Sequence, residues 1–313
     1  MNFEGVFSVL PTPFTADGAV DFTSLRNVVD LYIAAGINGL TALGVTSEVA
    51  RLNEVEREQI LACVIEQVNG RVPVVAGASA DGTRACVEFC SRACSMGAKA
   101  VMVSPPRLAK LNSEAVLRHY KTLADSVGTS IVVQDFPPTS GYFLEPALLA
   151  RIAREVPVAR TIKLEDPPTP FKTARILAQT EGIEVAILGG LGGVYLLEEL
   201  ISGAAGVMTG FAYPEILVEV VRRFKSGDLD GASDIFYSHV ALMRFEFQEN
   251  IGMAIRKEVL RRRGVVAEAG IRLPGGELDK HTRLALDRLL AWIHESSDLN
   301  LQGTASVSQS QGD

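Results

Sequence analysis

The sequence predicts a (β/α)₈ TIM barrel followed by an appended C-terminal helical region. Eight strand-like segments alternate with eight helix-like segments, and this alternation indicates an all-parallel sheet. The number of segments and the length of 313 residues favour a closed barrel over an open sheet. The first strand runs into Leu10-Pro11-Thr12-Pro13-Phe14, without the Gly-x-Gly-x-x-Gly turn of a dinucleotide-binding sheet. We expect a catalytic barrel over 1–226, helices over 227–298 and a tail over 299–313.

The expected strands are short runs rich in apolar residues. They are 6–11, 39–44, 72–78, 100–104, 130–136, 160–165, 185–189 and 206–210. The segments between them carry apolar residues at helical spacing. These are 22–35, 54–68, 83–96, 113–127, 145–155, 171–179, 195–202 and 214–225. Asp21, Asn53 and Ser113 are residues of the type that caps helix N-termini.

Beyond about residue 226 the alternation stops, and only helical periodicity continues. We expect helices over 232–247, 251–263 and 281–294. The Ser- and Gln-rich end, from about 302 to 313, has too few apolar residues to pack and is expected to be disordered.

Composition and charge exclude several classes of protein. The net charge of −7 argues against a nucleic-acid-binding surface. No apolar stretch approaches the ~20 residues that span a bilayer, and the first residues do not resemble a signal peptide. The expected location is therefore the cytoplasm, without a membrane partner.

The cysteines and histidines do not predict a metal site. Cys86, Cys90 and Cys94 are four residues apart on one stripe of an expected helix, whereas metal-binding cysteines usually lie closer together and in loops. Buried free cysteine is common in protein cores. The four histidines are scattered along helical segments. No metal and no cofactor is expected.

Lys163 is the main candidate catalytic residue. Side chains alternate between the two faces of a strand, so Ile162 and Leu164 share one face while Thr161, Lys163 and Glu165 share the other. In a closed barrel the polar set faces the interior, where loss of hydration favours the neutral, nucleophilic amine. Such an amine condenses with a ketone to form a Schiff base. The alternative is a lysine that reaches solvent or pairs with Glu165.

Candidate substrate-binding residues follow other strands, because the catalytic groups of such barrels gather at the carboxyl ends of the strands. Gly44-Val45-Thr46-Ser47-Glu48 is a turn whose backbone N–H groups, with the Thr46 and Ser47 hydroxyls, are suited to holding a carboxylate. Gly190, in a glycine-rich turn, and Thr209 end the last two strands. A carboxylate site beside an amine predicts a 2-oxo acid as the small-molecule substrate.

At this point the chain resembles the dihydrodipicolinate synthase and N-acetylneuraminate lyase superfamily. The resemblance covers about 3–295 and rests on the opening Leu10–Phe14 with Gly18 and Asp21, the Gly44-x-Thr46-x-Glu48 turn, Gly77, the Pro137/Gly141 segment and Ile162-Lys163. It implies a barrel that assembles as a homodimer or homotetramer. It also implies class I aldolase-type chemistry, in which Lys163 attacks the C2 carbonyl of pyruvate or a related 2-oxo acid.

The chain departs from the family pattern at the residues that relay protons. Val45 replaces the first threonine of the usual turn, and Gln134 replaces the relay tyrosine. Thr139 replaces an arginine that binds the second substrate in synthases, and Pro105-Pro106-Arg107 lacks the usual tyrosine. The amide of Gln134 can position a group but cannot act as an acid or base. Proton transfer therefore requires another group.

Glu165 is our hypothetical general base, with Asp135 also bordering the site; Glu165 could instead be only a structural partner of Lys163. The altered relay favours an aldolase or dehydratase of a 2-oxo-3-deoxy sugar acid. Dihydrodipicolinate synthase, which condenses pyruvate with aspartate semialdehyde, is the second hypothesis. A barrel that binds a 2-oxo acid without catalysis is the third.

Overall fold

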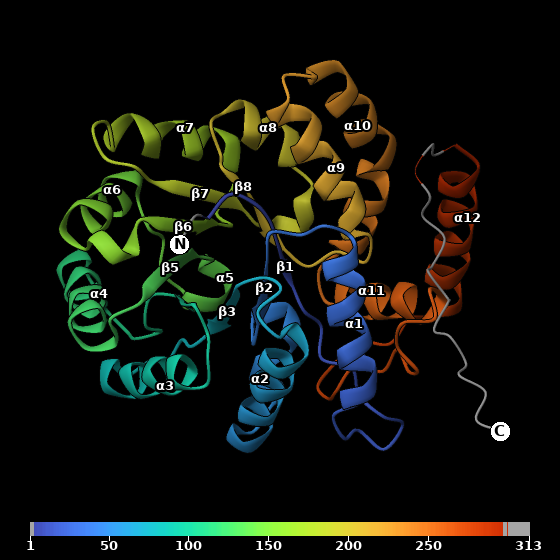
Figure 1. Cartoon of the computed structure of the whole chain (residues 1–313), viewed down its shortest axis with the longest axis horizontal. Coiled ribbons are helices and arrows are strands. Elements are labelled where there is room, and N and C mark those ends of the chain that lie inside the picture. Colours follow the sequence, from blue (N-terminus) through green and yellow to red (C-terminus); the bar gives the residue numbers. More distant parts are fainter. Residues whose placement is uncertain (1–2, 297–298, 300–313) are drawn as a thin grey trace.

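The structure, a computed structural model, describes residues 3–296 and 299. Eight parallel strands pair in sequence order and close into a barrel. The strands are β1 (Gly5–Val9), β2 (Gly39–Ala42), β3 (Val74–Gly77), β4 (Ala100–Val103), β5 (Ser130–Asp135), β6 (Thr161–Leu164), β7 (Ala186–Gly189) and β8 (Gly206–Thr209). Figure 1 shows helices forming a ring around these strands. The (β/α)₈ barrel expected from the sequence is confirmed.

The ring contains the eight expected helices. They are α1 (Phe22–Ala34), α2 (Glu54–Val68), α3 (Thr83–Ser95), α4 (Ser113–Val127), α6 (Pro146–Glu155), α7 (Thr169–Gln179), α8 (Leu196–Ile201) and α9 (Pro214–Lys225). Asp21 and Asn53 cap α1 and α2 as predicted. The prediction for the fourth helix is one residue off: Asn112 is the cap, because its side chain accepts from the N–H of Ala115.

Short helices that the sequence pattern did not predict lie in the loops. They are α5 (Pro137–Ser140), η1 (Val45–Ser47), η2 (Val49–Arg51), η3 (Pro157–Ala159) and η4 (Leu191–Gly193). Single turns of this kind are too short to show a hydrophobic period. Three of them, η1, α5 and η4, follow the carboxyl ends of strands and so border the barrel mouth.

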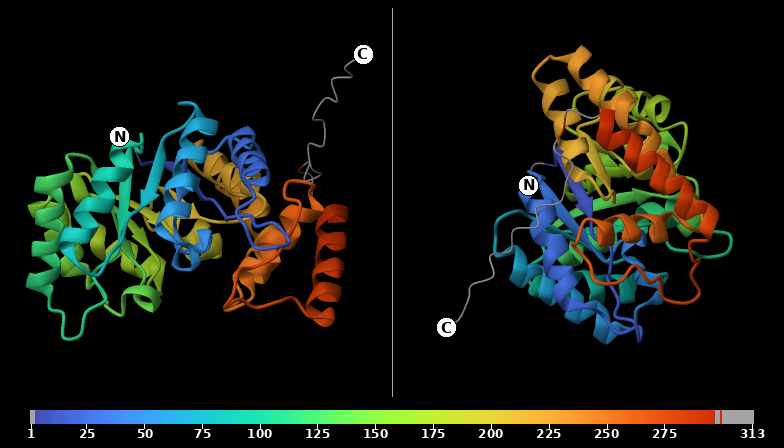
Figure 2. Two further views of the ribbon diagram at one scale, coloured as in Figure 1. Left: turned by 90° about the horizontal axis from the view of Figure 1, so that it is seen from below. Right: turned by 90° about the vertical axis from the view of Figure 1, so that its right-hand side faces the viewer.

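The C-terminal region contains α10 (Leu229–Glu246), α11 (Gly252–Arg262) and α12 (Lys280–Ser296). Helix α10 packs against α9, and α11 and α12 pack against α10. Figure 2 shows α11 and α12 beside the barrel rather than within its ring. The expected disordered tail lies, apart from residue 299, outside the described residues. Within 3–296, no helix combines the length and apolar character needed to cross a membrane.

Two separate apolar clusters show which way each strand residue points. The interior of the barrel is filled by residues such as Phe7, Val75, Met102, Val132 and Met208. The larger cluster lies between the strands and the helices and contains Ile162 and Leu164 among its members. A residue's position relative to these two sets therefore decides whether it faces the barrel interior or the surrounding helices.

Candidate active site

Lys163 lies in the barrel interior, as its position between Ile162 and Leu164 predicts. Both neighbours pack against the helices, so the lysine points the other way. Only 3% of Lys163 is exposed. Its Nζ lies 3.0 Å from Oε1 of Glu165, which comes from the same face of the chain two residues later. A buried amine and a carboxylate are thus in direct contact inside the barrel.

A chain of hydrogen bonds leads from this pair to the ends of the neighbouring strands. The second carboxylate oxygen of Glu165 accepts from Gln134 Nε2 at 2.8 Å. The carbonyl Oε1 of Gln134 accepts from the hydroxyl of Ser104 at 3.0 Å, and Ser79 Oγ accepts from the Ser104 N–H at 2.9 Å. Because both ends of the Gln134 amide are engaged, the amide holds the Glu165 carboxylate in one orientation.

Ser104 and Ser79 were not among the residues that the sequence singled out. Ser104 follows Met102 by two positions, and Met102 lies in the barrel interior. The same alternation that located Lys163 therefore indicates that Ser104 faces inward. Strand alternation therefore predicts the direction of Ser104, but serine at the end of a strand is too common to be recognised as a site residue without the tertiary structure.

Gly190 provides the space that the Glu165 side chain occupies. A β-carbon on Gly190 would lie 2.1 Å from Cγ of Glu165, well inside any allowed contact. The preceding Gly189 makes room in the same way for a second buried carboxyl, Glu199, whose Oε2 would lie 1.7 Å from such a β-carbon. Burial raises the pKa of Glu199 to about 7, and the hydroxyl of Thr169 donates to its Oε1.

Asp135 points away from Lys163. Its neighbour Val133 packs against the helices, and Asp135 follows it on the same face. The Asp135 carboxylate lies 2.6 Å from Nζ of Lys172 on α7, which also contacts Asp166 at 2.7 Å. Burial raises the pKa of Asp135 to about 6, partly offset by the Lys172 charge. Asp135 is therefore engaged behind the barrel wall, which leaves Glu165 as the carboxylate beside Lys163.

The Gly44–Glu48 turn is folded as the short helix η1, and its two hydroxyls differ in what they contact. Ser47 Oγ donates to the carbonyl of Leu10 at 2.5 Å and accepts from the N–H of Gly44 at 3.1 Å. Its own carbonyl accepts from Thr12 Oγ1 at 2.6 Å. The Thr46 hydroxyl is buried and has no hydrogen-bond partner among the described residues. Ser47 thus holds the turn together, while the Thr46 hydroxyl is available to a ligand.

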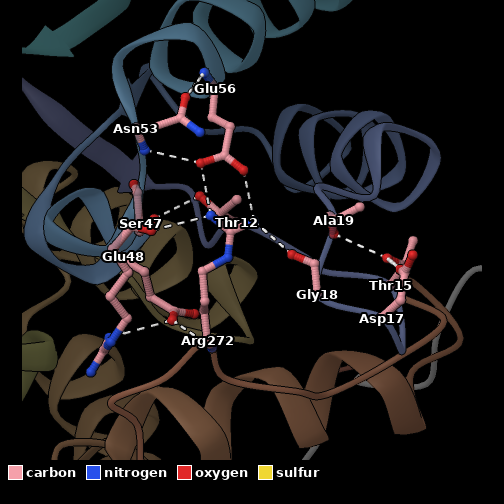
Figure 3. Close-up of polar contacts among 11 residues, drawn as sticks. Thr12, Thr15, Asp17, Gly18, Ala19, Ser47, Glu48, Asn53, Glu56 and Arg272 are labelled. Carbon is pink, nitrogen blue, oxygen red and sulfur yellow. Dashed lines mark hydrogen bonds and ion pairs between the residues drawn. The ribbon is translucent and has the colours of Figure 1, made fainter.

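Residues of the C-terminal region brace this turn from outside. Glu48, in the left-handed conformation at φ 58°, forms a buried ion pair with Lys257 of α11 at 2.5 Å. Figure 3 shows Arg272 reaching over the turn, where its backbone N–H donates to Glu48 and its guanidinium pairs with Glu56. The Lys257 ammonium and the Arg272 guanidinium also make cation–π contacts with the Phe14 ring, each 4.3 Å from its centroid. The C-terminal region thus supports the Gly44–Glu48 turn from its outer side.

Thr209 lies where the sequence placed it, at the end of β8, but its hydroxyl is engaged. Its Oγ1 accepts from the N–H of Gly192 at 3.0 Å. Thr209 follows Val207, which packs against the helices, so the side chain belongs to the outer face of the strand. It stabilises the turn after β7 and so supports the glycine that makes room for Glu165.

A cavity of about 320 Å³ opens at the ends of β2 to β5. Its lining includes Val45, Ser104, Arg107, Gln134 and Thr139. Lys163 and Glu165 are not part of this lining. Glu165 is hydrogen-bonded to the lining residue Gln134, and Lys163 contacts Glu165. Val45, Arg107, Gln134 and Thr139, where the chain departs from the family pattern, therefore all line this cavity.

The cysteines and histidines take no part in this arrangement. Cys63, Cys86 and Cys90 are buried, and all four cysteines are free thiols. Across the described ranges, no three His, Cys, Asp or Glu side chains group in a way that could hold a metal ion.

Comparison with known proteins identifies the family. The chain matches the Dihydrodipicolinate synthetase family over residues 2–293. The chain belongs to this family. It is 31% identical over 301 residues to L-2-keto-3-deoxyarabonate dehydratase from Azospirillum brasilense, covering 93% of this chain and 97% of that protein.

Other relatives carry different names. A 4-hydroxy-tetrahydrodipicolinate synthase from Nitratidesulfovibrio vulgaris is 33% identical over 276 residues, covering 88% of this chain and 92% of that protein. The crystal structure of YagE from E. coli K12, in complex with pyruvate, superposes with a TM-score of 0.87 at 25% identity, covering 94% and 99% of the two chains. Family membership confirms that the chain is a lyase of this family, as its sequence indicated.

Proposed function

We propose that this chain dehydrates a 2-oxo-3-deoxy sugar acid through a Schiff base on Lys163. The observation that carries the proposal is the contact between a buried amine and a partly buried carboxylate, Lys163 Nζ to Glu165 Oε1 at 3.0 Å. The amine supplies the nucleophile and the carboxylate supplies the base that Val45 and Gln134 cannot. The relative named as an L-2-keto-3-deoxyarabonate dehydratase supports this choice.

The reaction balances with these two groups and water. The Lys163 amine attacks the C2 carbonyl, the carbonyl oxygen leaves as water, and an iminium forms. Glu165 then removes a proton from C3, and the electron pair moves to the nitrogen as an enamine. The enamine expels the C4 hydroxyl, which takes a proton and leaves as a second water. Hydrolysis of the resulting iminium frees the product and restores the amine.

The remaining site residues orient and make room for these groups. Gln134 and Ser104 fix the direction of the Glu165 carboxylate. Gly190 leaves space for it. The Thr46 hydroxyl, which lacks a protein partner in the described chain, is proposed to bind the substrate carboxylate. Ser47 and Thr209 act through the turns that they stabilise.

A 4-hydroxy-tetrahydrodipicolinate synthase is the second candidate. It shares the Schiff base, and one observation favours it: Arg107 lines the cavity and offers a cation to the carboxylate of a second substrate. Against it, Thr139 stands in the same cavity wall where the family pattern has an arginine. Aldol cleavage of the same acids would also use Lys163 and Glu165. Glu165 would then take the proton of the C4 hydroxyl, the C3–C4 bond of the iminium would break, and an aldehyde would leave while the pyruvate enamine stays on Lys163.

Borohydride trapping with pyruvate, followed by mass spectrometry, tests the proposal. We expect an adduct on Lys163 in the wild type and none in Lys163→Ala. Glu165→Gln should retain the adduct and lose about 100- to 10,000-fold in turnover, the range for a general acid–base group. Turnover in Glu165→Gln equal to that of the wild type would refute the role of Glu165 as the general base.

The product then identifies the reaction. A panel of 2-oxo-3-deoxy sugar acids is assayed for loss of water and for release of pyruvate, and aspartate semialdehyde is supplied with pyruvate in a coupled assay. Dehydration supports our proposal, pyruvate release indicates an aldolase, and consumption of aspartate semialdehyde indicates the synthase. A wild type without any adduct would leave the hypothesis of a non-catalytic binding protein.

We further infer that the chain works as a homodimer or homotetramer in the cytoplasm. Phe171 on α7 and Ile201 on α8 are each 60% exposed, which fits burial by a second copy. Free cysteines fit a reducing compartment. Light scattering coupled to gel filtration gives the oligomeric state, and a monomeric mass would contradict the inference.

A further inference from the structure

An arginine from the C-terminal region enters the barrel mouth beside β8. Gly210 follows Met208 by two positions, and Met208 fills the barrel interior, so the missing side chain of Gly210 would also point inward. A β-carbon there would lie 2.4 Å from Nη1 of Arg256 on α11 and 3.1 Å from Oγ1 of Thr46. Gly210 thus leaves a space on the inner face of the barrel in which a guanidinium and a hydroxyl approach the same point.

Both of these groups have hydrogen-bonding capacity that the described chain does not use. Arg256 is only 4% exposed, and its Nη1 has no partner. The Thr46 hydroxyl beside it is likewise buried and without a partner. Leaving such donors buried and unpaired is unfavourable, and more so for a charged group. Two unsatisfied donors directed at one place therefore indicate an acceptor that binds there.

The guanidinium is held in position by a buried carboxylate on its other side. Nε of Arg256 lies 3.2 Å from Oε2 of Glu246, which also accepts from the N–H of Ala212 at 3.2 Å. Burial raises the pKa of Glu246 to about 7, so near neutral pH this carboxyl cancels only part of the arginine charge. The pair thus anchors Arg256 and leaves positive charge at Nη1.

Charge decides which part of a substrate would lie here. A 2-oxo acid bound through C2 to Lys163 carries its carboxylate on the adjacent carbon. The Glu165 carboxylate already occupies one side of Lys163, and two carboxylates at close range repel each other. The unpaired guanidinium beside Thr46 offers the opposite charge and two hydrogen-bond donors.

We propose that Arg256 and Thr46 together bind the carboxylate group of the 2-oxo acid, with Gly210 providing the space between them. This inference rests on the proposed Schiff-base function of Lys163. It assigns a substrate-binding residue to the C-terminal helical region and makes that region part of what selects 2-oxo acids over other ketones.

The test measures how Lys163 trapping depends on ligand concentration for two ketones. Pyruvate carries the carboxylate, and hydroxyacetone carries the ketone without it. In Arg256→Gln, the pyruvate concentration that gives half-maximal trapping should rise about 10- to 100-fold, as expected for loss of one charged hydrogen bond. Trapping by hydroxyacetone should change less than about twofold, and saturating pyruvate should still label Lys163.

Two further variants separate binding from folding. Gly210→Ala keeps the arginine but places a methyl group in the space, and it should raise the half-saturating pyruvate concentration in the same way. Arg263→Gln is the matched control, because Arg263 is also largely buried and instead pairs with Glu215 at 2.7 Å. It should lower the thermal midpoint and leave the pyruvate concentration dependence unchanged.

Three results would overturn the inference. One is an unchanged pyruvate dependence in Arg256→Gln and Gly210→Ala. The second is an equal loss for pyruvate and hydroxyacetone, which would show that Arg256 only supports the fold. The third is a wild type that gives no Lys163 adduct, which would overturn the proposed function as well. If the wild type gives the adduct but Arg256→Gln keeps the wild-type pyruvate dependence, only the carboxylate contact is overturned.

Discussion

Replacing Gly190 by alanine tests how closely the rate depends on the position of the Glu165 carboxylate. The added β-carbon would lie 2.1 Å from Cγ and 2.7 Å from Cδ of Glu165. Non-bonded carbon atoms approach to about 3.5 Å, so the side chain must move by about 1 Å or more. That movement separates Oε1 from Nζ of Lys163, which are now 3.0 Å apart.

The expected effect follows from this displacement. A misplacement of about 1 Å in a catalytic group can cost about 100-fold in rate. We therefore expect kcat of Gly190→Ala to fall about 100-fold, while borohydride trapping of pyruvate on Lys163 persists because the amine itself is untouched. The assay is steady-state turnover of the acid identified by the substrate panel, with trapping measured in parallel.

A glycine elsewhere serves as the control for the added methyl group. Gly270 has no atom within 4 Å of the position of a β-carbon, so Gly270→Ala should keep wild-type turnover. Turnover of Gly190→Ala within about threefold of the wild type would refute the reasoning, since the carboxylate would then act equally well from a displaced position.

Two further predictions concern stability. Burial raises the pKa of Glu199 from 4.5 to about 7, so the folded chain keeps a proton that the unfolded chain releases. Glu199 therefore adds about 3 kcal/mol to the free energy of unfolding at acidic pH, and this contribution is lost as the pH rises to about 7. Urea unfolding at pH 5 and at pH 8 measures the loss, and Glu199→Gln should lack this part of the pH dependence. Arg272→Ala removes two 2.8 Å contacts to Glu56 and should lower the unfolding free energy by about 2 kcal/mol in the same assay. Arg84→Ala, whose ion pair is 94% exposed at the arginine, should change it by less than about 0.5 kcal/mol, and equal losses in the two variants would contradict the role of Arg272.

Local sequence was sufficient to predict the inward face of β6. Ile162, Lys163 and Leu164 alternate between apolar and polar, and strand geometry turns that alternation directly into direction. The same rule separates Gln134, which faces the barrel interior, from Asp135, which pairs with Lys172 behind it. The sequence analysis left both Glu165 and Asp135 as possible bases. Closeness along the chain to a site residue does not show whether a side chain lies in the site or beside it.

Contacts between distant segments required the closed barrel. Gln134 meets Glu165 because β5 pairs with β6 in a register that places Gln134 opposite Lys163. Register depends on how all eight strands close, and no local period encodes it. The Ser47 and Thr209 hydroxyls likewise bond to backbone groups that are distant in the sequence, and these bonds form only because the loops pack against one another.

The amino-acid sequence by itself determined the barrel, its order of strands and helices, and the inward direction of Lys163 and Glu165, because hydrophobic period and strand alternation are local properties. Only the tertiary structure decided that Gln134 and Ser104 orient the carboxylate, and that Arg256 from α11 reaches Thr46 across the gap left by Gly210. Contacts between such distant residues depend on where whole helices pack, and the entire core determines that packing rather than the contacting residues themselves.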